Sequence, residues 1–314
     1  MDSEQVRKKF VGSLLGAALG DAVGASWEGY WMAGKQVIEV ATRLRDVLRY
    51  TDDTHMTIGV AESLAECGGF DGAHMAGRFA DNYYHEPWRG YGPGPPQVFR
   101  LIKGGQPWDE AAENIYPGGS FGNGSAMRAA PIGLFFWDQP AELREAAYQS
   151  SLITHSHVLG KEGAALQATA VALAVAEDPA RPFEPLSFAS RLLDSITEDT
   201  YRKKIGIFST LLARPDDRKR VVRELGHGIE AFNSVPTAIF AFLANHQDFA
   251  SAVIYAISLG GDTDTIASMA GAIAGAYLGV DALPTDWLGR LENQDYIFSL
   301  AERLWQAASG KRVK

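Results

Sequence analysis

A glycine repeat inside one apolar segment constrains the fold more than any other feature of the sequence. The segment GGDTDTIASMAGAIAGAYLG, residues 260–279, carries Gly271, Gly275 and Gly279 at intervals of four residues, which places them on one face of a helix. Each glycine costs about 1 kcal/mol relative to alanine in a helix interior. We therefore predict that a neighbouring helix backbone packs against this face. The uncharged run 265–280 is shorter than the roughly 18 residues of a membrane span, so we expect a core helix.

Two carboxylates precede this helix. Asp262 and Asp264 alternate with Thr263 and Thr265. Such residues are good helix caps, and the helix dipole favours anions at this end. One cap needs one residue, however, and four oxygen-bearing side chains in succession indicate a rigidly held metal or substrate site.

A second acidic cluster has a similar composition. The segment YTDDTHMT, residues 50–57, places Thr51, Asp52 and Asp53 directly before another helical pattern. Alone, this segment is more typical of a helix cap, but two such clusters favour a shared metal site. Carboxylates and hydroxyls are hard ligands that suit Mg²⁺, Mn²⁺ or Ca²⁺ rather than zinc. A shared site requires the two clusters to meet in space, which predicts a single domain over residues 1–314.

Composition and charge exclude several classes of protein. The chain of 314 residues carries a net charge of −9, which argues against nucleic-acid and membrane surfaces because both attract basic faces. Cys67 is the only cysteine, so an intramolecular disulfide and a cysteine-built zinc site are excluded. The run RKKFVGSLLGAALG, residues 7–20, resembles a signal peptide. It is glycine-rich and followed by Asp21, and we interpret it as an amphipathic helix of a cytoplasmic protein.

Helical periodicity dominates the remaining sequence, and alternating strands are scarce, so we predict an all-α fold. The segments with helical spacing, rich in Ala and Leu, are 56–66, 74–84, 125–136, 161–177, 187–196, 235–246 and 266–279. Glycine and proline mark loops at 90–97, 117–124, 177–185 and 213–219, and the last two are candidate linkers.

Two glycine-rich loops are candidate binding segments. RGYGPGPPQ (89–97) and GGSFGNGSAMR (118–128) are expected to expose backbone amides, and the second leads into a predicted helix, whose N-terminus favours phosphate. Neither loop is a Walker motif, because no GK[ST] follows, and neither follows a predicted strand, as a Rossmann fold requires. The first is equally consistent with an ordinary turn, whereas four glycines at one bend favour binding by the second.

The sequence argues against three other functions. A prenyl-diphosphate synthase needs a DDxxD pattern, but Met56 stands where the third aspartate belongs. A helical HD-type phosphohydrolase needs a His-Asp dipeptide, which the chain lacks. A binding or structural protein on this scaffold would have no need of both acidic clusters and Glu28.

The motifs together resemble the ADP-ribosylglycohydrolase family. They are LGDAVGASWEG, YTDDTHMT, GSFGNGSAMRAAPIGL, THSHVLGKEGAALQA and GGDTDTIASMAGAIAGAYLG, spread from about residue 11 to residue 280. The resemblance implies a compact, orthogonal multi-helix fold with two Mg²⁺ ions, or Mn²⁺, at the base of a cleft. It also implies hydrolysis of the bond joining ADP-ribose to a protein side chain, poly(ADP-ribose) or an acetyl group. We expect a monomer with no direct contact to nucleic acid or membrane.

The resemblance also implies roles for individual residues. The implied catalytic groups are Glu28, Asp52 and Asp53, and the implied metal ligands are Thr51, Asp52, Asp53, Asp262, Asp264 and Thr265. The implied substrate contacts are Gly90, Gly92, Gly94, Gly118, Gly119, Ser120, Phe121, Gly122, Asn123 and His155. Phe121 stands where the family often has tyrosine, so a hydroxyl contact is lost.

Three segments point to a branch of the family. WEG, RGYGPG and SVPTAIF resemble the branch acting on serine-linked and polymeric ADP-ribose and O-acetyl-ADP-ribose. The alternatives are an ADP-ribosylarginine hydrolase of the same family, or a non-catalytic member that binds ADP-ribose or has a structural role.

Overall fold

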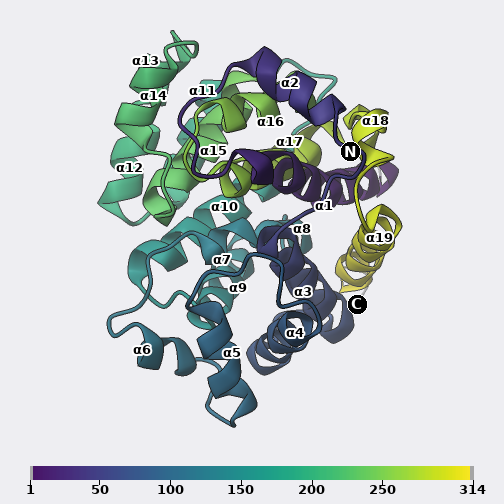
Figure 1. The fold of residues 1–314 in the computed structure, drawn as a ribbon, viewed down its shortest axis with the longest axis vertical. Coiled ribbons are helices and arrows are strands. Elements are labelled where there is room, and N and C mark those ends of the chain that lie inside the picture. The colour runs from purple at the N-terminus through teal and green to yellow at the C-terminus, as the bar shows by residue number, and fades with distance from the viewer. Residues whose placement is uncertain (1–2, 312–314) are drawn as a thin grey trace.

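The computed structural model describes residues 3–311, and all regular elements in that range are helices (Figure 1). In chain order they are α1 (Ser3–Gly24), η1 (Ala25–Trp27), α2 (Lys35–Arg43), α3 (Asp52–Cys67), α4 (Gly72–His85), α5 (Pro95–Lys103), α6 (Ala111–Ile115), α7 (Gly124–Met127), α8 (Ala130–Phe135), α9 (Pro140–Leu152), α10 (Val158–Ala176), α11 (Pro185–Ser195), α12 (Asp199–Gly206), α13 (Phe208–Leu212), α14 (Arg218–Leu225), α15 (Ala231–Ala244), α16 (Phe249–Ser258), α17 (Thr263–Leu278), η2 (Val280–Ala282), α18 (Thr285–Leu288) and α19 (Gln294–Lys311). The predicted all-α fold is confirmed.

Helices α1 and α17 pack backbone against backbone at the centre of the fold (Figure 1). An alanine at Gly275 would place its Cβ 2.0 Å from the carbonyl oxygen of Gly12, and one at Gly271 would place its Cβ 2.3 Å from that of Gly16. No side chain fits at these positions, so the close helix contact predicted from the glycine repeat is confirmed.

Gly279 lies just beyond the helix, so its assignment to the helix was wrong, but its backbone still packs against α1: a Cβ on Gly12 would lie 2.7 Å from the Gly279 carbonyl carbon. Helix α17 ends at Leu278, and Gly279 adopts φ +81° as the capping residue, with its amide donating to the oxygen of Gly275 at 2.9 Å. Glycine is favoured here because it tolerates a positive φ.

The contact also continues toward the start of α17. A Cβ on Gly20 would lie 2.0 Å from the oxygen of Ala267, and one on Gly24 would lie 2.6 Å from that of Thr263. The Thr263 hydroxyl also donates to the Gly24 oxygen at 3.0 Å. This contact fixes the N-terminus of α17 against α1.

Helix α1 is a buried central helix rather than the amphipathic helix expected from the sequence. All of its residues from Lys9 to Gly24 are buried. By length and composition, Ser3–Trp27 and Val158–Ala176 are apolar enough to cross a membrane, but 83% and 72% of their apolar windows are buried inside the protein. A core helix meets the same criterion, so these two segments are weak evidence for a membrane span.

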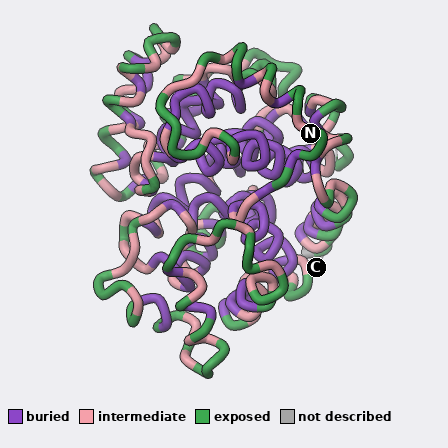
Figure 2. Tube along the Cα trace, in the orientation of Figure 1, coloured by how far each residue is buried: buried purple, intermediate pink, exposed green. Residues whose placement is uncertain are grey.

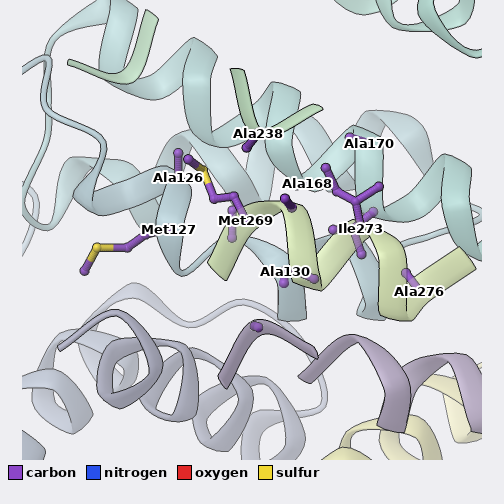
Figure 3. Packing of buried hydrophobic residues seen from close by; sticks show 14 of the residues in the cluster. Ala126, Met127, Ala130, Ala168, Ala170, Ala238, Met269, Ile273 and Ala276 are labelled. Carbon is purple, nitrogen blue, oxygen red and sulfur yellow. The ribbon is translucent and has the colours of Figure 1, made fainter. Parts of the chain in front are cut away.

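Small side chains allow the central helices to approach one another. Figure 3 shows Met269 and Ile273 of α17 among the alanines of α10 and α15, including Ala168, Ala170 and Ala238. The buried residues gather along these helices, whereas the outer helices alternate buried and exposed positions (Figure 2). Close packing of this kind leaves little room for adjustment in the core.

Two predicted segment boundaries are wrong because of proline. Residues 125–136 form α7 and α8 rather than one helix, since Pro131 lacks an N–H group and cannot donate the helical hydrogen bond to the carbonyl of Met127. The predicted loop 90–97 ends earlier, because Pro95 and Pro96 occupy the first turn of α5, a position where proline is favoured. The segments 177–185 and 213–219 are largely loops, and the helices that flank them contribute to one hydrophobic cluster.

The α1–α17 contact predicts that Gly275→Ala destabilises the protein. The added methyl group meets the backbone of Gly12, so the two helices must separate, at a cost of about 1–3 kcal/mol or more. Gly77→Ala on α4 is the matched control, because a Cβ there meets nothing within 4 Å and alanine gains about 1 kcal/mol of helix propensity. Chemical denaturation should show opposite changes in the two variants; equal unfolding free energies would contradict the packing account.

Candidate functional site

One cleft of about 280 Å³ collects most of the residues that the sequence singled out. Among its lining residues are Glu28, Thr51, Asp52, Asp53, Gly90, Gly92, Gly94, Ser120, Gly122, Asn123, His155, Asp262, Asp264 and Thr265. Gly118, Gly119 and Phe121 lie outside this lining. Sequence reasoning did not single out several other lining residues, including Met56, Tyr116, Met127, Thr154 and Ile229.

The two acidic clusters meet in this cleft, as the sequence predicted. Carboxylate oxygens of Glu28, Asp262 and Asp264 lie within 4.8 Å of one another. Asp52 and Asp53 reach the same cleft from the first turn of α3. Residues near positions 52 and 262 therefore form one site.

Burial and mutual repulsion disfavour the charged form of these carboxyls. Burial, with the charge of Asp21 next, raises the pKa of Asp52 to about 7. Burial also raises the pKa of Asp53 and of Asp264 well above the usual range, with the neighbouring aspartates adding to the effect. A cluster of this kind is stable in ionised form only when positive charge is brought to it.

Asp21 of α1 anchors the start of α3 through hydrogen bonds. Its fully buried carboxylate accepts hydrogen bonds from the amide and the hydroxyl of Thr51 and from the amide and the hydroxyl of Thr54, at 2.6–3.1 Å. Burial raises its pKa to about 6, against the effect of these hydrogen bonds. The sequence analysis missed this role, although a single carboxylate inside an apolar helix was a signal for it.

Two glycines before α17 bring the Glu28 loop to the cluster. Gly260 and Gly261 have φ of +75° and +78°, and a Cβ on Gly261 would lie 2.1 Å from the oxygen of His227. Their backbone pairs with the loop after η1: the Gly29 amide donates to the Gly261 oxygen at 2.9 Å, and the Gly261 amide donates to the Tyr30 oxygen at 3.0 Å. Glu28 is thereby held at the cleft mouth.

Glu28 is exposed at this mouth, whereas the aspartates are buried or half-buried. Partial burial, and then the charge of Asp262, raise the pKa of its carboxyl. It is therefore a carboxyl that faces both solvent and the cluster.

The glycine-rich loop 118–123 is joined to the cluster through Asn123. Its side-chain amide donates to Asp262 Oδ2 at 2.5 Å and to Ser234 Oγ at 3.1 Å. Gly122 forms an isolated antiparallel bridge with Glu230. These contacts tie the loop to both α15 and α17.

Fewer amides of this loop are available than the sequence suggested. Those of Gly118, Gly119, Gly122 and Asn123 already donate to acceptors within the protein. Among the described residues, only the amides of Ser120 and Phe121 within 118–123 have no such acceptor. The following helix α7 has four residues, so its dipole adds little to the binding of an anion.

His155 packs against the glycines at the end of the same loop. Its Nδ1 is 2.7 Å from the Thr154 hydroxyl, and an alanine at Gly124 would place its Cβ 2.5 Å from His155 Cε1. Burial, and then the charge of Arg128, lower the pKa of His155 to about 3. The ring is therefore neutral at pH 7 and offers a neutral polar contact to a ligand.

Phe121 is an exposed aromatic residue beside the cleft that packs on two half-buried rings. Its side chain is 45% exposed, and its ring centroid lies 5.5 Å from that of His157 and 6.0 Å from that of Phe232. It offers a flat surface outside the acidic cluster.

The residues present fit a hard divalent cation. Asp53 Oδ2 is buried and has no hydrogen-bond partner in the protein. Within residues 3–310, no lysine or arginine forms an ion pair with the clustered carboxylates. An unpaired carboxylate oxygen among further carboxylate and threonine oxygens matches the oxygen donors that Mg²⁺ and Mn²⁺ select.

Comparisons with known proteins point to one family. The sequence matches the family model of ADP-ribosylglycohydrolase over residues 2–314. It is 38% identical to the ADP-ribosylhydrolase ARH3 of Xenopus tropicalis over 318 residues, covering 89% of this chain and 89% of the relative. It is also 38% identical to ARH3 of Homo sapiens over 341 residues, covering 94% of this chain and 92% of the relative.

A solved structure shows the same fold. An ADP-ribosylglycohydrolase-related protein complex matches with a TM-score of 0.74 at 24% sequence identity, covering 97% of this chain and 99% of that chain. At this identity the similarity concerns the arrangement of the helices.

The unpaired Asp53 oxygen predicts a stability change on metal binding. At a Mg²⁺ concentration of 100 times its Kd, binding should stabilise the wild type by about 2.7 kcal/mol and raise its melting temperature. Asp53→Asn should lose this rise, yet should be no less stable without metal, because one of several like charges is removed. Asp281→Asn, at a carboxylate whose side chain is 71% exposed, is the control. The melting temperatures are measured by scanning calorimetry. If Mg²⁺ raised the melting temperature of Asp53→Asn as much as that of the wild type, Asp53 would not be a metal ligand.

Proposed function

The chain belongs to the ADP-ribosylglycohydrolase family, and on this basis we propose that it cleaves the C1″ bond joining ADP-ribose to a serine side chain, to poly(ADP-ribose) or to an acetyl group. It is a hydrolase that acts on ADP-ribosylated substrates. The observation that carries the finer proposal is the meeting of Glu28, two acidic clusters and a glycine-rich loop in one cleft.

The acidic clusters are the proposed metal site. The side chains that would hold two Mg²⁺ ions, with Mn²⁺ as the alternative, are Thr51, Asp52 and Asp53 at the start of α3 and Asp262, Asp264 and Thr265 at the start of α17. Such ions would supply Lewis-acid stabilisation of charge that develops on oxygen and would orient the ribose hydroxyls. The buried, unpaired Asp53 oxygen supports this assignment.

The glycine-rich loop is the proposed site for the rest of ADP-ribose. The amides of Ser120 and Phe121 have hydrogen atoms to donate to diphosphate oxygens, and the neutral ring of His155 offers a further polar contact. Glycines at 122 and 124 leave room for this ring. The exposed ring of Phe121 presents a face on which a base can stack. The loop is also coupled to the acidic cluster, because Asn123 donates to Asp262.

Glu28 is the proposed proton-transfer group. Cleavage of a C1″ glycosidic bond builds positive charge on the ribose and negative charge on the leaving oxygen. At its carboxylate oxygen, Glu28 accepts a proton from the attacking water if it acts as the base, and donates one to the leaving oxygen if it acts as the acid. Its raised pKa brings proton exchange closer to neutral pH in either role.

The linkage is tested directly by offering the purified protein three substrates. Serine-linked, arginine-linked and O-acetyl ADP-ribose are each incubated with and without EDTA. We expect turnover of the serine-linked and O-acetyl substrates, and loss of turnover when the chelator removes the metal. Preference for the arginine linkage would assign the chain to the arginine branch, and binding of ADP-ribose without turnover of any substrate would make it a non-catalytic member.

A proton-transfer role predicts that Glu28→Gln lowers the rate far more than it weakens binding. The amide keeps the shape of the side chain but cannot accept a proton, so single-turnover hydrolysis should fall roughly 10²–10⁴-fold. The Kd for ADP-ribose, measured by calorimetry, should change little. Glu142→Gln, an exposed carboxyl on α9, should change neither quantity. Equal losses of rate and affinity in Glu28→Gln would instead assign Glu28 to binding.

A further inference from the structure

The loop between α4 and α5 alternates residues that line the cleft with residues anchored elsewhere. Gly90 and Gly92 line the cleft, whereas the side chains of Arg89 and Tyr91 contact other elements. Gly90 has φ +91°, and a Cβ there would lie 3.8 Å from Asp52 Oδ1. The loop therefore runs against the first acidic cluster, and its two anchors determine where the glycines lie.

Arg89 joins three separate segments of the chain. Its Nε donates to Glu86 Oε2 at 2.5 Å, and its Nη1 donates to Glu292 Oε1 at 2.6 Å and to the Tyr50 oxygen at 3.1 Å. The guanidinium carbon also lies 4.1 Å from the centroid of the Tyr50 ring. With only 9% of this side chain exposed, these charge-assisted contacts are partly shielded from solvent and hold a defined geometry.

Glu292 completes the connection to the metal-ligand segment. Its Oε1 also accepts the Tyr50 amide at 2.8 Å, and its own amide donates to the Leu48 oxygen at 3.1 Å. Tyr50 immediately precedes Thr51, the first proposed metal ligand. The Glu292 carboxylate, just before α19, therefore binds both the segment that leads into Thr51 and the loop that carries Gly90.

Tyr91 provides a second tie between the same two segments. Its hydroxyl lies 2.8 Å from Nδ1 of His55, which follows Asp53 by two residues on α3. Its ring packs against Tyr83 and Phe99, with centroids 5.1 Å and 6.1 Å away. Arg89 and Tyr91 thus fix the loop on both sides of Gly90.

We propose that Arg89 and Glu292 are positioning residues that set the separation between the Gly90–Gly94 wall of the cleft and the acidic cluster. Neither side chain lines the cleft, so each acts through the backbone that it holds. This inference rests on the proposed function, since the separation matters for the binding and orientation of the ADP-ribosyl group. A displacement of about 1 Å in such a site can cost about 10²-fold in rate.

The test compares Arg89→Met, Arg89→Lys and Glu292→Gln with a matched control, Arg49→Met. Arg49 also faces Glu292, at 4.0 Å, but its side chain is 74% exposed. Kinetics on serine-linked ADP-ribose and calorimetric titration with ADP-ribose are run well below each melting temperature, with the folded fraction confirmed by circular dichroism. Tyr91→Phe, which keeps the ring packing and removes only the hydroxyl, serves as a variant that folds if Arg89→Met does not.

We expect Arg89→Met to lower kcat/KM by about 10²-fold and to weaken ADP-ribose binding in proportion. Arg89→Lys keeps the positive charge but not the planar guanidinium with its several donors, so it should lose less kcat/KM than Arg89→Met. Arg89→Met combined with Glu292→Gln should be no worse than Arg89→Met alone, because both act on one contact. Tyr91→Phe should lower kcat/KM about tenfold, since it removes the contact between the Tyr91 hydroxyl and His55 that also positions this loop.

Two results would overturn the inference. One is a lowered melting temperature with unchanged kcat/KM and Kd per folded molecule, which would leave Arg89 and Glu292 with a structural role only. The other is an equal loss in Arg49→Met, which would mean that general surface charge is responsible. Failure of the proposed function looks different, because the wild type itself would then show no hydrolysis. If it still binds ADP-ribose, the Kd values alone decide the inference; if it does not, the inference falls with the function.

Discussion

The backbone contact between α1 and α17 is the constraint on which the rest of the structure depends. Because glycines face each other along both helices, the two backbones approach until a single Cβ would clash. Each helix carries carboxylates at the end of this contact: Asp21 on α1, and Asp262 and Asp264 at the start of α17. Asp21 in turn holds Thr51 and Thr54. The packing of small residues in the core therefore determines how the two acidic clusters meet.

Gathering these carboxylates opposes stability, which marks the cluster as functional. Burial and like charge raise the pKa of Asp52, Asp53 and Asp264, and a fold that needed only helix caps would have no reason to bring them together. The rigid helix pair holds the carboxylates at close range despite their repulsion. A divalent cation would remove this conflict, since it would supply the positive charge that no lysine or arginine provides within the described residues.

The loops that line the cleft are each joined to this centre by specific hydrogen bonds. The Glu28 loop pairs with Gly261, the glycine-rich loop reaches Asp262 through Asn123, and the Gly90 loop is anchored through Arg89 to Glu292. Each tie joins residues more than a hundred positions apart in the sequence. The cleft is thus assembled by long-range contacts around a centre that the two helices define.

Local patterns in the sequence were sufficient to predict the helical class, the close packing of residues 271–275 and the meeting of the two clusters. These features follow from periodicity, residue size and ligand chemistry, which a sequence displays directly. The family was predicted from the resemblance of its motifs. Only the tertiary structure decided four other features. They are the pairing of the amides of residues 118–123, the anchoring role of Asp21, the exposure of Glu28 and the contact of Arg89 with Glu292. A hydrogen bond between segments that are distant in the chain depends on how the intervening helices pack, and no local pattern encodes that packing.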